Sequence, residues 1–236
     1  MNLTAIAWLS IGLSVLCAFV IAVDEARHPQ GMAVMNVVWP VTALYFSVFA
    51  LWAYFTLGRG KSSTAVRQRK AEGKGLQATA KVGQRAPTLA QVALGTSHCG
   101  AGCMIADVGT EFAIAATSLT LFGSVLWSEY ILDFAVAWAL GIVFQYLAIK
   151  PMRPQLSPGM ALWAAVKADT LSIAAFQVGM YLFMALVYFK LFPAPHHLAA
   201  FDPRYWLMMQ IAMICGFLTS FPMNRLLIAR GIKEAM

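Results

Sequence analysis

Four side chains that can do chemistry recur at intervals of four residues: Cys99, Cys103, Asp107 and Glu111. Residues four apart lie on one face of an α-helix, so these side chains should form a single stripe, with thiols at one end and carboxyls further along. His98 stands next to the first cysteine in the run HCGAGC. Thiolates beside an imidazole favour soft ions such as Cu(I) or Zn(II). The sequence therefore predicts a metal site formed by His98, Cys99, Cys103 and Asp107.

The cysteine spacing does not fit other well-known cysteine sites. It is not the CxxC of a zinc knuckle or a redox pair, and the i,i+4 geometry of a helix is poor for a disulfide. A second interpretation stays open at this stage. Gly100 and Gly102 would then be helix-packing residues, and the cysteines small buried apolar side chains.

Further carboxyl groups, those of Asp133 and Asp169, fall inside long apolar runs. A charged side chain at the centre of a bilayer costs about 2.5–3.5 kcal/mol on insertion scales, so such groups usually line a cavity or a relay. Asp169 shares a helical face with Gln177. We therefore expect a polar path or proton relay made of four residues: Glu111, Asp133, Asp169 and Gln177. Asp107 should face Asp133 and Asp169 and point away from lipid.

Composition indicates the class of protein. Hydrophobic residues make up 60% of the 236 residues and charged residues 11%, and the mean hydropathy is +0.70. A soluble domain of this length cannot bury so much apolar surface. The fold class predicted is an all-α, polytopic membrane bundle. Apolar runs of roughly 20 residues or more, the length needed to cross a bilayer, occupy 3–23, 34–57, 99–122, 126–149, 160–189 and 206–229.

Basic residues predict the orientation of these six spans. Segment 58–88 contains eight lysines and arginines against the single acid Glu72, and such segments stay in the cytoplasm. Alternation from there predicts that both termini are cytoplasmic and that only three basic residues outside the spans lie on the other side: Arg27, Lys190 and Arg204. The expected location is the cytoplasmic (inner) membrane of a bacterium.

The same segment divides the chain into three predicted parts. Residues 1–57 form a transmembrane hairpin, 58–88 a basic linker, and 89–236 a four-helix membrane domain that carries the HCGAGC motif. The linker lacks interleaved aromatic residues and any nucleic-acid-binding motif. We therefore expect it to rest on anionic lipid head groups, with no nucleic acid as a partner.

Several runs in the C-terminal part carry a resemblance to a known family. They are HCGAGC with Asp107, then GIVFQY (141–146), KADTLSIAAFQVGM (167–180), MMQIAMICGF (208–217) and GIKEAM (231–236). Over most of 95–236 the chain resembles the bacterial membrane family known as domain of unknown function 4396. The resemblance implies a multi-helix membrane domain marked by the cysteine motif, and it implies no activity.

Three functions are consistent with these patterns. The first is a protein that binds and transports or donates Cu(I) or Zn(II), captured at the cytoplasmic face and passed to the intramembrane carboxyls. The second is a proton-coupled carrier of a small solute, and the third an accessory or assembly subunit without transport activity. No enzyme motif such as HExxH or GxSxG is present, and the four histidines all fall outside the apolar runs, so we do not expect an enzyme. A homo-oligomer or a membrane partner subunit is compatible with all three.

Overall fold

The computed structural model describes residues 2–59 and 87–233, and this part of the chain is helical and contains no named strand. Five helices are long and apolar enough to cross a membrane. They are α1 (Leu3–Arg27), α5 (Leu89–Thr117), α6 (Val125–Met152), α7 (Pro158–Leu186), which continues as the π-helical turn η3 (Val187–Leu191), and α8 (Pro203–Ala229). The predicted all-α membrane bundle is therefore confirmed.

Short polar signals begin three of the long helices. Thr88 and Gln91 form a reciprocal capping box at the start of α5, which satisfies backbone N–H groups that have no partner inside the helix. Ser157 and Asp202 cap α7 and α8, each followed by a proline at the first helical position. Because α5 begins at Leu89, ten residues before the predicted span, the HCGAGC motif lies inside the helix and not at its end.

The apolar run 34–57 differs from the prediction of one continuous span. It forms α2 (Met35–Phe46), then α3 (Val48–Ala53) continued by the π-helical turn η1 (Tyr54–Gly58). The break is at Ser47, whose backbone has φ 49° and ψ −122°. This conformation is outside the helical region, so the chain changes direction there.

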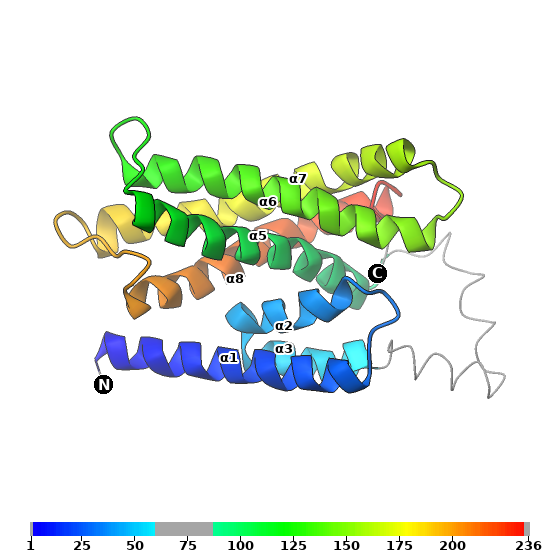
Figure 1. Cartoon of the computed structure of the whole chain (residues 1–236), viewed down its shortest axis with the longest axis horizontal. Coiled ribbons are helices and arrows are strands. Elements are labelled where there is room, and N and C mark those ends of the chain that lie inside the picture. Colours follow the sequence, from blue (N-terminus) through cyan, green and yellow to red (C-terminus); the bar gives the residue numbers. More distant parts are fainter. Residues whose placement is uncertain (1, 60–86, 234–236) are drawn as a thin grey trace.

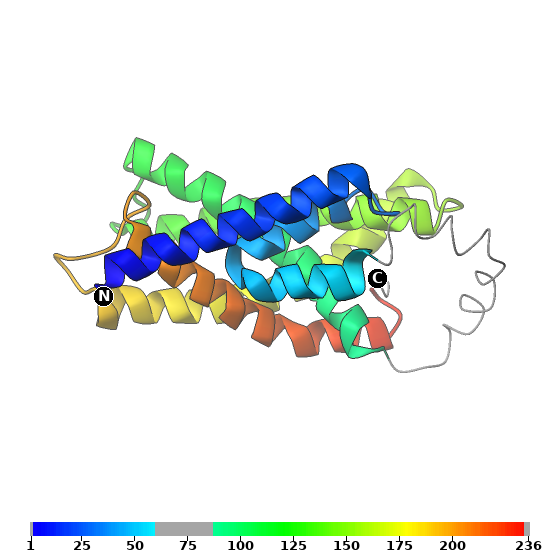
Figure 2. The same cartoon turned by 90° about the horizontal axis from the view of Figure 1, so that it is seen from below.

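Helices α2 and α3 lie antiparallel and together form a hairpin that enters the bundle and returns to the same end (Figures 1 and 2). The tip at Ser47 lies beside Cys17, in the second half of α1, with Oγ and Sγ 4.0 Å apart. At the open end of the hairpin, Gly58 lies against the ring of Trp39. The hairpin is therefore re-entrant and does not cross the bundle.

The re-entrant hairpin changes the topology. In the described structure, α1 begins at the end of the bundle opposite to that at which α8 ends (Figure 1). The expectations of six full spans and of termini on one side are therefore not met. The new arrangement also brings Arg27 to the end shared by Arg59 and Lys150, while Lys190 and Arg204 lie at the other end. The basic residues are therefore concentrated at one end of the bundle more strongly than in the predicted topology.

Helix α5 is the central element of the bundle. In its most apolar window 61% of residues are buried, against 22% in α1. Small residues of the HCGAGC motif permit close contacts: Gly102 lies against the backbone of Gly141 on α6, and a side chain on Gly100 would collide with the hydroxyl of Tyr45 on α2. The packing interpretation of both glycines therefore fits the structure.

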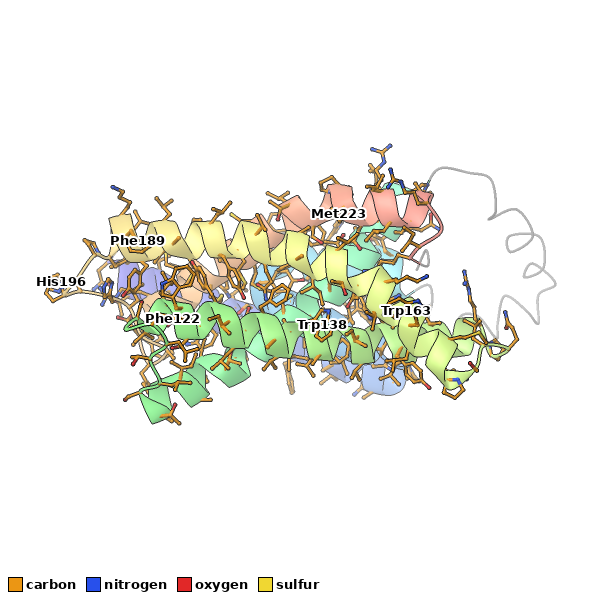
Figure 3. All side chains as sticks on the ribbon, turned by 90° about the horizontal axis from the view of Figure 1, so that it is seen from above. Phe122, Trp138, Trp163, Phe189, His196 and Met223 are labelled. Atoms are coloured by element: carbon orange, nitrogen blue, oxygen red, sulfur yellow. The ribbon has the colours of Figure 1, made fainter. Side chains whose placement is uncertain are left out.

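Large apolar side chains cover the outside of the bundle, as Figure 3 shows for Phe122, Trp138, Trp163 and Phe189. Phe122 is 87% exposed, and both Trp163 and Phe189 are 61% exposed. A soluble protein rarely exposes so much contiguous apolar surface, so this surface is in contact with lipid. The predicted linker contacts with anionic head groups concern 58–88, of which 60–86 lie outside the described residues.

Candidate functional site

The chain reverses direction after α8 and brings Lys233 back into the bundle. Gly231 adopts φ 67°, a left-handed conformation that glycine tolerates without a steric penalty. The backbone N–H groups of Ile232 and Lys233 then both donate to the carbonyl oxygen of Leu227, at 2.9 and 3.2 Å. This turn directs the Lys233 side chain inward, where it is fully buried.

The Lys233 ammonium is surrounded by three polar groups from two helices. Its Nζ lies 2.8 Å from Cys99 Sγ on α5, 3.2 Å from Asp169 Oδ1 on α7 and 3.3 Å from Ser172 Oγ, also on α7. Cys99 Sγ in turn donates to Asp169 Oδ1 at 3.1 Å. We call Cys99, Asp169, Ser172, Asn224 and Lys233 the inner cluster.

The inner cluster extends to α8 through neutral hydrogen bonds. Ser172 Oγ donates to Asn224 Oδ1 at 2.9 Å, and Asn224 Nδ2 donates to Ser220 Oγ at 2.8 Å. Burial of Lys233 lowers its pKa, but the nearby Cys99 sulfur and Asp169 carboxylate more than offset this, and the net pKa is raised. The inner cluster therefore favours the charged form of the buried Lys233 side chain.

The predicted metal ligands do not converge. Cys99 contacts Lys233, whereas His98 is buried on the other side of α5, edge-on to the Phe144 ring of α6 at 5.8 Å between centroids. The ring nitrogens of His98 make no hydrogen bond of ordinary geometry, and the polar group beside them is the backbone of Phe144. Among residues 2–59 and 87–233, no three His, Cys, Asp or Glu side chains are grouped so that they could hold an ion. The expectation that His98 lies outside the apolar interior is also not met.

Two carboxyl groups lie further along α5 and α6, near the middle of the bundle. Asp107 is fully buried, and neither of its carboxylate oxygens has a hydrogen-bond partner. Asp133 is also buried and accepts a hydrogen bond from Thr110 Oγ1. Cys103 is fully buried beside them on α5. Asp107 and Asp133 are close enough to interact electrostatically, so we call them the middle acids.

Glu111 is the last residue of the predicted stripe and lines a pocket at the far end of α5. Glu129 of α6 and Tyr205 of α8 line the same pocket. Gln177, predicted as a part of the path, is buried on α7 and its amide has no hydrogen-bond partner. The sequence prediction did not identify Tyr205 as a site residue.

Together these groups form a column of buried polar side chains that runs along α5. Glu111 follows Cys99 by 12 positions, a rise of about 18 Å along the helix at about 1.5 Å per residue, which is more than half of a hydrocarbon core of about 30 Å. The inner cluster lies at one end, the middle acids follow, and the pocket lies at the other end. Such a column can accept, hold and pass protons.

The sequence alone does not identify Lys233 as a site residue. Its role in the inner cluster depends on the Gly231 turn and on the packing of α5 against α7 and α8. The segment GIKEAM, which belongs to the resemblance, was the one signal that pointed to it. Ser172 was missed because an isolated serine in an apolar helix most often bonds only to its own backbone.

The long apolar helices and the buried polar column define an integral membrane helical bundle. Residues 88–233 match the family described as Domain of unknown function (DUF4396), and the chain belongs to this family. The match begins at the cap of α5 and ends at Lys233, so it includes the whole column. The comparisons with curated proteins and with solved structures found no match.

Proposed function

We propose that the chain is a proton-coupled membrane carrier of a small solute. One observation carries the proposal: buried carboxyl groups follow one another along α5 between an open pocket and a buried ammonium. In this proposal Glu111 receives protons at the pocket, and the middle acids pass them along. Asp169 exchanges between an ion pair with Lys233 and a proton-bearing state.

The chemistry of the middle acids favours proton transfer over a packing role. Two anions placed this close in a low dielectric repel each other, so the pair shares a proton or a cation. Asn and Gln would hold helices together without that electrostatic cost. Asp107 makes no hydrogen bond that requires a carboxylate, which supports a role in which its proton content changes.

Charge asymmetry supports an orientation for the carrier. Arg27, Arg59 and Lys150 lie at the end of the bundle where η1 ends and α5 begins, and an excess of basic residues marks the cytoplasmic side. The inner cluster then faces the cytoplasm and the pocket faces the opposite side. The membrane proposed is the inner membrane of a bacterium.

Reconstituted liposomes test the proposal. The purified protein is placed in vesicles that contain a pH-sensitive dye, and a low-molecular-weight extract of bacterial cells is added outside as the source of solute. We expect a change in internal pH with the wild type and its loss in Asp107→Asn/Glu111→Gln. Glu25→Gln, a buried acid at the end of α1, is the matched control and should behave as the wild type.

Two results would contradict the proposal. One is an internal pH that follows protein-free vesicles for the wild type. The other is an unchanged signal in Asp107→Asn/Glu111→Gln at equal incorporation, which would make the acids structural and favour an accessory or assembly subunit.

A soft-metal function is the second candidate, because Cys99, Asp169 and Ser172 already enclose a cation, the Lys233 ammonium. A Cu(I) or Zn(II) ion would have to displace that ammonium, and Cys103 would have to reach the same point. Metal analysis of detergent-purified wild type, Cys99→Ser/Cys103→Ser and Lys233→Met tests this function. It requires metal in the wild type, more in Lys233→Met and none in the double serine variant.

A further inference from the structure

The pocket at the far end of the column has the size of a small-molecule site. Its volume is about 360 Å³, within the range of roughly 300–1,000 Å³ typical of ligand pockets. The last turns of α5, the first turns of α6, η3 and the segment before α8 surround it. Ser118 and Thr120 belong to its lining and are exposed, so the pocket opens to the surface.

The lining of this pocket combines two acids with apolar walls. Glu111 and Glu129 face it from adjacent helices, and no lysine or arginine is among its lining residues. An anionic solute would meet two carboxyl groups, with His197 as the one basic side chain in the lining. A cationic solute relieves the repulsion between those groups. The walls are formed mainly by apolar side chains such as Ile114, Leu126 and Val187, which suit a hydrocarbon body.

A buried phenol provides independent support. Tyr205 lines the pocket and is 3% exposed, and its hydroxyl faces the Glu111 carboxyl without a hydrogen bond of ordinary geometry. A buried polar group without a well-formed hydrogen bond is costly, and a ligand beside Glu111 can supply the missing partner. Tyr188 lines the same pocket and stacks on His197, with ring centroids 3.8 Å apart. An aromatic face of this kind attracts a cation.

We propose that this pocket binds a small organic cation, an ammonium group on an apolar body. Glu111 and Glu129 act as counter-ions, the apolar walls hold the body, and Tyr205 is the hydrogen-bonding or aromatic contact. The inference deepens the proposed carrier function, because it names the class of solute and places it beside Glu111, the outermost acid of the column.

A set of three probes of similar size tests the charge requirement. Benzyltrimethylammonium carries the positive charge, neopentylbenzene is its neutral isostere, and benzenesulfonate is an anion. Binding of each labelled probe to the full-length protein in lipid nanodiscs is measured by equilibrium dialysis. We expect benzyltrimethylammonium to bind at least about tenfold more tightly than the other two, since one counter-ion contact contributes about 1.4 kcal/mol.

Three variants test the residues. Glu111→Gln and Glu129→Gln should each weaken benzyltrimethylammonium binding about tenfold, whereas binding of neopentylbenzene stays unchanged. Tyr205→Phe should leave benzyltrimethylammonium binding unchanged, because this quaternary ammonium has no N–H to donate to the hydroxyl and the aromatic ring is retained. Glu25→Gln, at the opposite end of the bundle, is the matched control and should bind as the wild type.

Equal binding of the charged and the neutral probe would overturn the inference, because the pocket would then be a non-selective apolar cavity. Wild-type affinity in both glutamine variants would overturn it as well. The binding of a variant is compared with that of the wild type only if both proteins have the same thermal unfolding temperature. Selective cation binding without any pH change in vesicles would retain this site and reject the carrier, whereas the reverse pattern would reject only the site.

Discussion

Lys233 Nζ and Asp169 Oδ1 lie 3.2 Å apart, although the two residues are 64 positions apart in sequence, and both side chains are fully buried. A buried ion pair adds little net stability over a well-packed apolar pair, because both charges lose their hydration. Removal of one partner is different, since it leaves a buried charge without compensation. The ion pair therefore holds the C-terminal turn against α7. Each of the two buried charges is compensated only while the other is present.

The first prediction follows from this dependence. Asp169→Asn should lower the free energy of unfolding by about 3–5 kcal/mol, because Lys233 then stays charged and buried beside neutral groups. The double variant Asp169→Asn/Lys233→Met should recover most of that loss. Thermal unfolding in detergent, monitored by tryptophan fluorescence, measures the cycle. Additive effects of the two single substitutions would show that the pair is not coupled.

The second prediction concerns the close contact of α6 with the inner cluster. A Cβ on Gly141 would collide with Ile173 and with Asp169 Oδ2, so Gly141→Ala should cost about 1–3 kcal/mol of stability. Gly109 on α5 is the matched control, because a Cβ added there would meet no atom within 4 Å. Gly109→Ala should be neutral or stabilise by up to about 1 kcal/mol. Equal melting temperatures for the two variants would contradict the packing described.

The third prediction tests the re-entrant hairpin at its tip. Ser47 has φ 49° and ψ −122°, a conformation that glycine adopts readily and β-branched residues avoid. Ser47→Gly should keep or raise the thermal stability, whereas Ser47→Val should lower it by about 1–2 kcal/mol. A stabilising Ser47→Val would instead favour one continuous helix through residues 34–57.

The fourth prediction is a pH dependence outside the spans. Asp202 accepts hydrogen bonds from the backbone N and the Nε of Arg204 at 2.9 and 3.0 Å, and these contacts with Arg204 lower its pKa below the ordinary 3.8. Because this pKa is lower in the folded state than in the unfolded chain, the Asp202 carboxylate stabilises the folded state at pH values above its unfolded-state pKa. This stabilisation is lost as the pH falls through the pKa of Asp202 in the folded state.

Asp202→Ala should therefore cost about 1 kcal/mol near neutral pH, mainly through the lost helix cap, because the exposed ion pair itself contributes little. The difference from the wild type should shrink below pH 3.8. Asp202→Asn retains a capping oxygen and should remain close to the wild type near neutral pH. Thermal unfolding measured across this pH range checks the prediction, and a difference that grows towards acid pH would contradict it.

Local periodicity in the sequence determined the class of fold and identified the residues of α5 that belong to the column. The apolar runs predicted the long helices because a membrane span needs a fixed length of hydrophobic residues. The spacing of Cys99, Cys103, Asp107 and Glu111 predicted one helical stripe, and all four are buried on α5. Both properties depend only on the geometry of a single helix, in which the spacing of residues along the chain determines where their side chains lie.

Tertiary packing decided the rest. The break at Ser47 was not predictable from an apolar run, because hydropathy is the same for a span and for a re-entrant hairpin. The contact of Cys99 with Lys233 requires the Gly231 turn together with the close approach of α5 to α7 and α8. His98 and Cys99 are neighbours in sequence but face opposite partners, since successive residues of a helix point about 100° apart. Only the packing of the helices determines that Cys99, and not His98, contacts the distant Lys233.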